Sequence, residues 1–154
     1  MTLAADDRFA ILDLIAQYNI AADEKDVEAT LAFYTEDGYI HGDMSTGRGK
    51  EAMRKDLPDI FAAEVTLKRH IASNFRFGER QMDEVEVTYI LLVIEAGIAP
   101  LTVATSIVTD TCRLVDGTWK IAHHHVAVDP SARWMVKAGE KVQSGVEKIK
   151  EVLS

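Results

Sequence analysis

The sequence has little cysteine, a shortage of basic residues and no long apolar run, and each of these excludes a class of site or partner. Its single cysteine, Cys112, cannot form an intrachain disulfide, and no activating base lies next to it, so we interpret it as a packed strand residue. No apolar run approaches the roughly 20 residues that a membrane-spanning helix needs. The amino terminus lacks a basic segment followed by an apolar core. We therefore expect a cytoplasmic protein with no membrane contact.

The shortage of basic residues bears on partners. The chain has 17 Lys and Arg against 25 Asp and Glu, which gives a net charge of −8 and a pI of about 5.1. No block of Lys and Arg stands out, so no nucleic-acid partner is expected. A chain of 154 residues with 47% hydrophobic content can bury a real core. Because no repeat, linker or low-complexity segment is present, we expect one domain over residues 1–154.

The first third of the chain has helical spacing. Asp6 or Asp7 is predicted to cap a first helix, whose apolar residues are Phe9, Leu12, Ile15 and Ile20. Asp26 is predicted to cap a second helix that runs through Tyr34. Residues 35–38 are typical of a turn, 39–41 of a short strand and 42–49 of a loop. A third helix is predicted over residues 50–63, with Pro58 ending or bending it near its middle.

From residue 65 onward the period changes to two. Strands are predicted over residues 66–77, 84–93, 102–114 and 119–128, and Asp116-Gly117 gives the strongest hairpin signal. A closing helix is predicted over about 130–153, after a core of about 6–129. Helices followed by four long strands are typical of an α+β domain, in which helices cover one face of a strongly curved antiparallel sheet. Such a sheet encloses a cavity.

The predicted strand over residues 66–77 carries a histidine where an apolar residue would be expected. Alternation puts His70, Ala72 and Asn74 on one face, with Phe75 and Phe77 on the other. Small Ala72 between two polar side chains leaves room for a ligand. The alternative is a histidine that is merely satisfied in the core or at the surface.

Four stretches carry a resemblance to a known family: IAQYNIAADEKDVEATLAFYTEDG, GRGKEAM, LKRHIASNFRF and DGTWKIAHHHVAVD. Together they resemble the SnoaL-like branch of the nuclear transport factor 2-like superfamily over about residues 6–129. The resemblance implies a cone-shaped, cystatin-like fold that serves dehydratases, isomerases, cyclases, hydrolases and non-catalytic binders. Function must therefore be argued from the site.

Within that branch, the sequence is most similar to scytalone dehydratase and bile acid 7α-dehydratase. The resemblance implies that Asp23, at the end of the first helix, pairs with His70 on the strand after the third helix. It also implies that Tyr18 contacts the substrate. Further cavity positions of these enzymes fall on His41, Glu95 and His124. Because these three depart from the residue types of the family, the resemblance does not name the substrate.

The pairing of Asp23 with His70 makes chemical sense without the resemblance. An aspartate that accepts from one imidazole nitrogen fixes the tautomer and makes the ring more basic, so the other nitrogen can deprotonate a carbon next to a carbonyl. Tyr18 could hydrogen-bond the developing enolate oxygen. At roughly 100° per residue the two α-helical positions lie about 140° apart, so Asp23 must lie at or past the helix end. The alternative for Asp23 is an ordinary acid at a helix end, and the alternative for Tyr18 is a core tyrosine.

The run His123-His124-His125 raises a metal hypothesis. Alternation puts His123 and His125 on the face of Trp119 and Ile121, and His124 on the other face. No recognised spacing supplies a third ligand, so no metal site is expected. Residues 47–50, Gly-Arg-Gly-Lys, lack the full spacing of a phosphate-binding loop and are interpreted as a plain helix start.

Two functional classes follow. The first is a cofactor-independent dehydratase or isomerase, hence a lyase or isomerase, that acts on a small cyclic oxygenated apolar compound of steroid, polyketide or aromatic type. His70 would be the base and Asp23 would orient it. The residues that would place the substrate are Tyr18, His41, Asn74, Glu95 and His124. The second class is a non-catalytic binding or assembly module of the same fold.

An assembly is also predicted. The strand over 102–114 has no clearly solvated face, although a curved sheet has only one concave side to bury. A second copy of the chain is the simplest cover for the convex side, and the resemblance implies the same. We expect a homodimer built from residues 89–93 and 103–111, with the cavities facing away from the interface.

Overall fold

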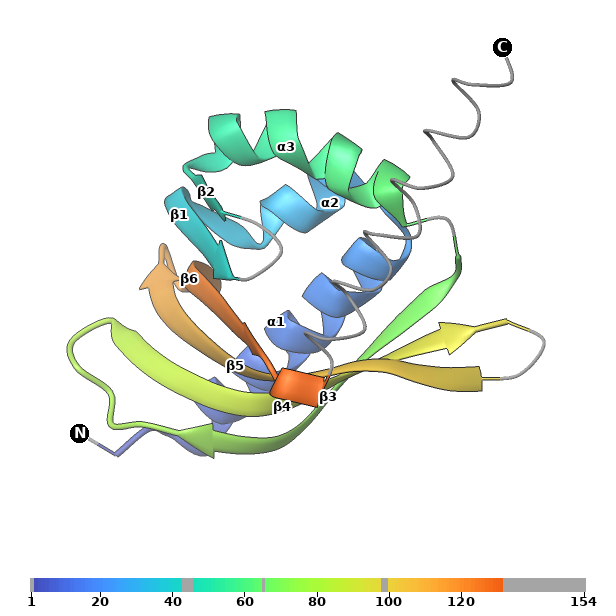
Figure 1. Cartoon of the computed structure of the whole chain (residues 1–154). Helices are drawn as coiled ribbons and strands as arrows, with labels where there is room; N and C mark the ends of the chain where they lie inside the picture. The colour runs from blue at the N-terminus through green and yellow to red at the C-terminus, as the bar shows by residue number, and fades with distance from the viewer. Residues whose placement is uncertain (1, 43–45, 65, 98–99, 132–154) are drawn as a thin grey trace, which may run out of the picture.

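Six strands form one curled, unclosed sheet around a long helix in the computed structural model, which describes residues 2–42, 46–64, 66–97 and 100–131 (Figure 1). The helices are α1 (Ala5–Asp23), α2 (Val27–Ala32) and α3 (Lys50–Ala63). The strands are β1 (Tyr34–Gly42), β2 (Thr46–Arg48), β3 (Lys68–Phe77), β4 (Glu84–Ala96), β5 (Pro100–Val115) and β6 (Thr118–Val128). The predicted α+β architecture is confirmed. Within the described ranges, no helix is long and apolar enough to cross a membrane.

The strand order is β2-β1-β6-β5-β4-β3. Neighbouring described strands are antiparallel except β1 and β6, which run parallel. The antiparallel arrangement predicted for the four long strands, β3 to β6, is confirmed, and the parallel pairing of β1 with β6 is an addition that the sequence did not predict. Parallel neighbours need a long crossover, and here β2 to β5 lie between them in the chain, so local patterns could not reveal the pairing.

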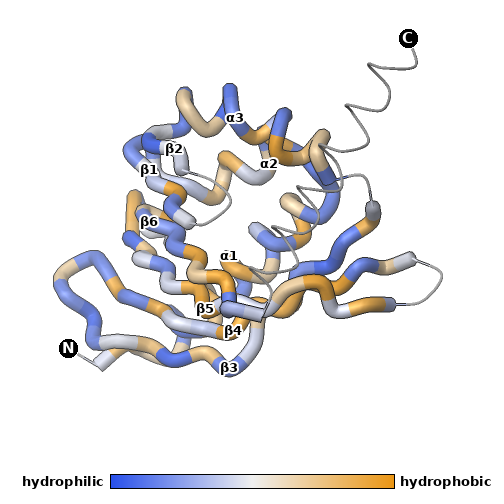
Figure 2. Tube along the Cα trace, viewed as in Figure 1, coloured by the Kyte–Doolittle hydropathy of each residue, from blue (hydrophilic) through white to orange (hydrophobic). Residues whose placement is uncertain are grey.

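The core lies between α1 and the concave face of the sheet. Alternate residues of β4, as predicted, are at most 8% exposed: Val85, Val87, Tyr89, Leu91 and Val93. α1 buries Ile11, Leu14, Ile15 and Tyr18 against them. Figure 2 shows hydrophobic residues concentrated where α1 faces β4 and β5. Burial of apolar area, at roughly 25 cal/mol per Å², is what holds α1 inside the curl.

The start of α1 differs from the prediction. Its N-cap is Ala4, which makes no side-chain cap. Asp7 instead accepts the indole N–H of Trp119 at 2.9 Å and an N–H of Arg80 at 2.9 Å, so its carboxylate is directed toward β6. Phe9, predicted to be in the apolar stripe, is 73% exposed. The buried stripe is set by contact with the sheet, which the helical spacing alone did not locate.

The segment around β1 and β2 is more regular than predicted. Asp26 caps α2 as expected, accepting from the N–H of Ala29 at 2.9 Å. Tyr34 begins β1 instead of ending α2, and β1 passes without a break through the predicted turn at 35–38. β2 lies within the predicted loop. α3 continues through Pro58 to Ala63, so the proline does not end it.

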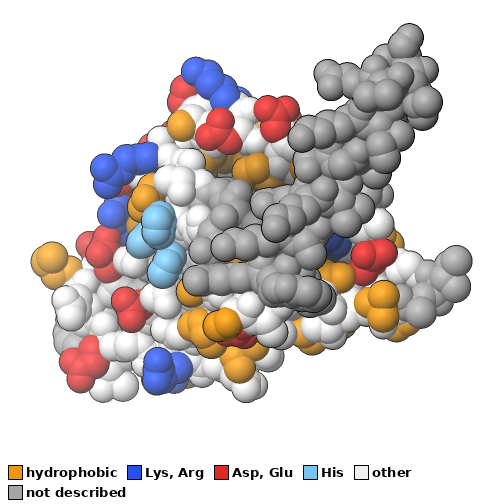
Figure 3. Space-filling model, viewed as in Figure 1, with side chains coloured by type: hydrophobic (Ala, Val, Ile, Leu, Met, Phe, Trp, Pro, Cys, Tyr) orange, Lys and Arg blue, Asp and Glu red, His pale blue; other side chains and the backbone are white. Residues whose placement is uncertain are grey.

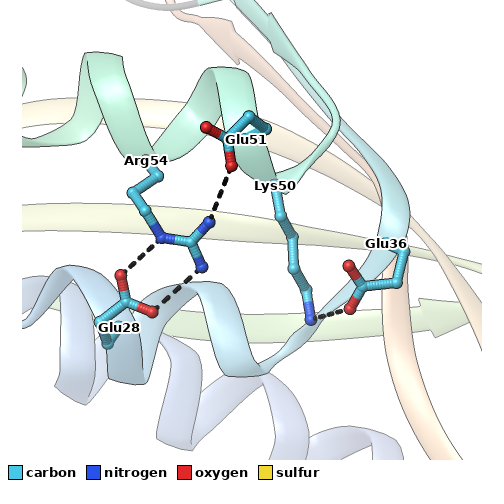
Figure 4. A network of polar contacts seen from close by, with 5 residues as sticks. All are labelled: Glu28, Glu36, Lys50, Glu51 and Arg54. Atoms are coloured by element: carbon cyan, nitrogen blue, oxygen red, sulfur yellow. Dashed lines mark hydrogen bonds and ion pairs between the residues drawn. The ribbon is translucent and has the colours of Figure 1, made fainter.

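Surface ion pairs join α2, α3 and β1 (Figure 4). Arg54 donates to both carboxylate oxygens of Glu28, at 2.7 and 3.1 Å, and to Glu51 at 3.4 Å. Lys50, the first residue of α3, donates to Glu36 of β1 at 2.8 Å. Solvent screens such exposed pairs, so they add little to stability. The Lys50 contact agrees with the interpretation of residues 47–50 as a plain helix start.

The hairpin between β5 and β6 is confirmed. Asp116 and Gly117 both have positive φ, 49° and 78°, as a two-residue turn of type I′ requires. Cys112 is buried in β5, and burial raises the pKa of its thiol, with a smaller contribution from Asp110. The predicted closing helix lies, from residue 132 onward, outside the described residues.

Asn74 interrupts the alternation of β3. Its φ is +55°, and the β3–β4 register shifts between Ser73 and Arg76. The bulge turns Asn74 outward and brings Phe75 and Phe77 to the concave face, where they pack against the core. The prediction that Asn74 shares a face with His70 is therefore wrong, because alternation holds only while no residue is inserted.

The bulge gives a stability prediction. A β-branched residue in the left-handed region costs roughly 1–2 kcal/mol, whereas glycine adopts it without that cost. We expect Asn74→Val to lower the free energy of unfolding by about that amount and Asn74→Gly to change it little. Urea denaturation followed by circular dichroism measures both. Equal loss in the two variants would contradict a requirement for positive φ.

Candidate active site

His70 and Asp23 meet where β3 passes the end of α1. His70 Nδ1 lies 2.7 Å from Asp23 Oδ1, and the backbone N–H of His70 donates to Oδ2 at 3.1 Å. One residue therefore engages both carboxylate oxygens. The His70 and Asp23 side chains are 20% and 9% exposed. This is the contact that the sequence predicts, while the catalytic roles stay predictions.

The position of Asp23 argues against an ordinary helix-end acid. Asp23 is the last residue of α1, as the facing argument required. Carboxylates cap helices at the amino-terminal end, and at the carboxyl end the helix dipole disfavours them by about 0.3–1 kcal/mol. The two bonds from His70 offset this cost. Asp23 therefore does not cap α1, and its carboxylate is directed at His70.

A second His–Asp pair lies on β5 and β6. His124 Nδ1 is 2.6 Å from Asp110 Oδ1, and the Tyr89 hydroxyl donates to Asp110 Oδ2 at 2.9 Å. The sequence prediction included His124 but missed Asp110 and Tyr89. The signal in the sequence for this pair is the carboxylate of Asp110, which lies between Val108 and Cys112 on the buried face of β5.

A bulge places His124 on the concave face. The β5–β6 register skips Ala122, so Ile121 and His124 are both buried while His123 and His125 lie on the other side. The prediction that His123 and His125 share a face with Ile121 is wrong for this reason. The extra residue reverses the alternation for the rest of the strand.

Tyr18 lies beside His124. It precedes Asp23 on α1 by more than one helical turn. Its ring meets the His124 ring edge-on at 5.1 Å between centroids, and Tyr34 donates to its hydroxyl at 3.1 Å. Burial raises the pKa of Tyr18 to about 12, with the Tyr34 bond opposing and the charge of Asp110 adding to the shift. Burial likewise raises the pKa of Tyr34 and of Tyr89. These phenols are neutral hydrogen-bonding groups at neutral pH.

The raised pKa of Tyr18 gives a test at high pH. Its pKa is about 12 in the folded protein against an ordinary value of 10.0, so its contribution to stability is full below pH 10 and is lost as pH rises through 12. We expect the free energy of unfolding to fall between pH 10 and 12. In Tyr18→Phe the fall should be shallower by about 1.4 kcal/mol per pH unit. Identical slopes in urea melts across this range would contradict the assignment.

His41 lies on the convex face of the sheet. Ile40 takes the concave side, and His41 stacks on His125 at 5.2 Å with its Nδ1 3.2 Å from the Tyr39 hydroxyl. Histidine side chains accordingly reach the surface beside β1 and β6 in Figure 3. The placement of His41 in the cavity is therefore wrong. Among the described residues, no group of three or more His, Cys, Asp or Glu is arranged to hold a metal ion.

Glu95 continues the concave face of β4. It lies two residues beyond Val93, which is the register partner of His70, and it is half-buried. Its own partner on β3 is Lys68. The structure therefore places Glu95 on the same concave face as His70. Asn74 lies on the convex face.

A cavity of about 230 Å³ lies between α3 and the β1–β2 edge. Ile40, Met53, Leu57 and Ile60 line it, and exposed Asp56 stands at its rim. The residues that line this space include neither His70 nor a member of the Asp110–His124 pair.

Residues 4–125 match the family model of the SnoaL-like domain. The chain belongs to the SnoaL-like family. This family includes polyketide cyclases and dehydratases. No curated protein matches the chain by sequence.

Solved structures of other proteins share the fold of this SnoaL-like chain. A cystatin-like protein of unknown function from Nostoc punctiforme PCC 73102 is 28% identical, with 85% of this chain and 97% of that one covered and a TM-score of 0.76. A proposed scytalone dehydratase from Novosphingobium aromaticivorans DSM 12444 is 21% identical, with 80% and 84% covered and a TM-score of 0.68. ActVI-ORFA from Streptomyces coelicolor is 20% identical, with 79% and 97% covered and a TM-score of 0.72. They confirm the predicted cystatin-like fold of the SnoaL-like family.

Proposed function

We propose that this SnoaL-like protein is a cofactor-independent dehydratase or isomerase of a small cyclic oxygenated compound. The observation that most supports this proposal is that both carboxylate oxygens of Asp23 are hydrogen-bonded to His70. A histidine that is merely satisfied in the core needs one partner, whereas a general base needs a fixed ring and a fixed tautomer. One of the solved structures with the same fold is a proposed scytalone dehydratase, so the fold is consistent with this reaction class.

The proposed reaction begins with proton abstraction. With Nδ1 engaged by Asp23, the other ring nitrogen of His70, Nε2, takes the proton from the carbon next to a carbonyl, and the C–H electron pair forms an enolate. In dehydration, the enolate then restores the carbonyl, a C=C bond forms, and the C–O bond at the next carbon breaks. The departing hydroxide takes up the proton that His70 Nε2 now carries and leaves as water, which returns His70 to its starting state. In isomerisation, the proton returns at another carbon instead.

The test uses 3-hydroxy-1-tetralone, whose dehydration and tautomerisation give 1-naphthol. It carries an acidic C–H beside a ketone and a hydroxyl on the next carbon, as the proposed reaction requires. We expect the protein to accelerate formation of 1-naphthol, detected by absorbance and by a mass loss of one water. A non-catalytic binding module would bind the compound without forming product, and that outcome would favour the second functional class.

We propose in addition that the convex face of the sheet pairs with a second copy. On this face Ile71 and Ile107 are 45% and 43% exposed, and Ile90 lies between them as register partner of Ser73 and Ile107. Exposed apolar side chains on adjacent strands are favourable to bury. The catalytic side chains lie on the opposite face of the sheet.

The assembly prediction is tested at Ile107. A buried unpaired carboxylate costs several kcal/mol, so Ile107→Glu should convert a dimer into a monomer. Size-exclusion chromatography with light scattering at micromolar concentration measures the mass. The matched control is Val115→Glu, at the exposed far end of β5, which should remain a dimer. A monomeric unmodified protein would rule the proposal out.

A further inference from the structure

The convex face of β1 and β6 carries an ordered array of aromatic rings that proton abstraction by His70 does not use. The convex ring array consists of Tyr39, His41, His123 and His125. Tyr39 pairs in register with His123, and His41 pairs with His125. Neighbouring rings of the array lie 5.0–6.2 Å apart between centroids, with interplanar angles of 16–25°. Histidine side chains are at the surface over these strands in Figure 3.

The contact between Tyr39 and His41 shows how these rings are turned. The lone pair of an imidazole nitrogen lies in the ring plane, so the Tyr39 hydroxyl, 3.2 Å from His41 Nδ1, meets an edge of that ring. The face of the His41 ring is turned to His125 across the strands, at 5.2 Å. Rings that stand on a sheet in this way direct their outer edges to solvent, and His41 is exposed.

This orientation makes His41 a hydrogen-bond donor to solvent. When the Tyr39 hydroxyl donates to Nδ1, the neutral ring carries its proton at Nε2. In the protonated ring both nitrogens carry a proton, so Nε2 donates in that state as well. The outer edge of the array therefore suits a ligand that accepts hydrogen bonds.

Arg48 of β2 adds a permanent positive charge at the side of the array. Its guanidinium lies over the Tyr39 ring, 5.4 Å from the centroid, and the two residues are register partners. Among the described residues, no carboxylate forms an ion pair with Arg48, His41 or His125. The array is thus a locally basic patch on a chain whose net charge is −8.

The other charged groups around the array are already paired or lie farther away. Thr109 and Thr111, which are uncharged, pair with His125 and His123 from β5. The charged groups are Asp37 of β1, bound by Arg113 of β5; Glu36 of β1, bound by Lys50; Glu86 of β4, two strands from β6; and the Asp110–His124 pair on the concave face.

The histidines of the array disfavour positive charge on one another. Burial lowers the pKa of His123, and the charges of His125, His41 and His124 lower it further. The charge of Asp110 opposes this shift. His123 Nε2 is buried and has no hydrogen-bond partner among the described residues. His123 is therefore a neutral stacking partner, and an anion above the array would offset the repulsion between protonated His41 and His125.

We propose that Arg48, His41 and His125 bind a sulfate or phosphate group at the convex face of the sheet. Guanidinium and imidazolium N–H groups form charge-assisted hydrogen bonds with such oxygens, and Tyr39 is the positioning residue between them. The site lies on the opposite face of the sheet from His70, so it goes beyond the proposed function and does not depend on it. It also lies on β1, β2 and β6, outside the strands of the proposed dimer interface.

Sulfate is the probe, because it remains a dianion across the range in which histidine titrates. It is added to ¹⁵N-histidine-labelled unmodified protein at an ionic strength held constant with sodium chloride. We expect saturable shifts of the ring nitrogens of His41 and His125, and no shift at His70. Affinity should fall roughly tenfold or more from about pH 6 to about pH 8, because the anion binds imidazolium and each proton taken up changes affinity by up to about tenfold per pH unit.

Three variants separate the site from general charge effects. Arg48→Gln should weaken sulfate binding roughly tenfold, the value of one charge-assisted hydrogen bond. The matched control is Arg76→Gln, which removes the same charge from an exposed position of β3 at the other edge of the sheet and should bind sulfate like the unmodified protein. The double variant His41→Gln/His125→Gln should bind sulfate weakly and without dependence on pH. Circular dichroism checks that each variant is folded.

Phenyl sulfate distinguishes an ester from the free ion. It has one charge fewer than sulfate, so binding at least as tight as that of sulfate identifies an ester as the ligand, and weaker binding identifies the free dianion. The proposal is overturned by shifts that do not saturate, by equal sulfate affinity at the two pH values, or by equal losses in Arg48→Gln and Arg76→Gln. None of these readouts involves 1-naphthol formation, so failure here is distinct from failure of the proposed function.

Discussion

His70→Gln is expected to reduce formation of 1-naphthol from 3-hydroxy-1-tetralone by roughly 10²-fold or more, because general-base catalysis contributes about that much. Glutamine is of similar size and can still donate a hydrogen bond toward Asp23. The backbone N–H of His70 also keeps its bond to Asp23 Oδ2 in the variant. We therefore expect an unchanged fold by circular dichroism.

The control for this variant is His125→Gln, which removes an imidazole from the convex face of β6. It should leave turnover near that of the unmodified protein. Turnover that survives in His70→Gln would remove His70 as the base. Equal losses in the two variants would mean that the effect is not specific to the His70–Asp23 pair.

The second large effect is on stability. His124→Leu removes the partner of a carboxylate that is 0% exposed, and breaking a buried pair on one side costs about 3–5 kcal/mol. Adding Asp110→Val removes the stranded charge, so the double variant should regain most of that loss. Urea denaturation of the two variants and of the unmodified protein measures the three free energies of unfolding.

His125→Leu is again the matched control, because it makes the same change on the other face of β6. It should lower the free energy of unfolding far less than His124→Leu. A double variant that is no more stable than His124→Leu would show that Asp110 and His124 do not form an energetic unit.

Local chemistry in the sequence was sufficient for most of the fold. The cap at Asp26, the turn at Asp116-Gly117 and the alternation of β4 depend on neighbouring residues, and all three are confirmed. The parallel pairing of β1 with β6 depends on a contact across about 80 residues of chain, which no local pattern encodes. α3 continues through Pro58 because Met53 and Leu57 before the proline, and Ile60 after it, pack against the core.

The sequence predicted one contact of the candidate site correctly and assigned several other side chains to the wrong face. The contact of Asp23 with His70 followed from the family resemblance and from the position of Asp23 at a helix end, and the structure contains it. Asn74 was misplaced, and the three histidines of β6 were assigned to the wrong faces, because one extra residue in each strand reverses alternation.

Asp110 was missed for a different reason. The β-branched residues around it predict a strand whichever residue stands at position 110, so the strand pattern does not single out its carboxylate. A carboxylate between Val108 and Cys112 on the buried face of β5 needs a buried partner, and His124 is the register partner of Asp110 on β6. This pairing requires the β5–β6 register, which the hairpin turn determines only after the bulge at Ala122 is known.

The measurement that tests the central claim most directly is solvent deuterium exchange at the carbon next to the ketone of 1-tetralone. This ligand cannot lose water, so exchange reports proton abstraction alone. In D₂O, the unmodified protein should accelerate deuterium incorporation at that carbon, and His70→Gln should reduce the acceleration by roughly 10²-fold. Incorporation at the same rate with and without the protein, or an equal rate in His70→Gln, would contradict His70 as the base.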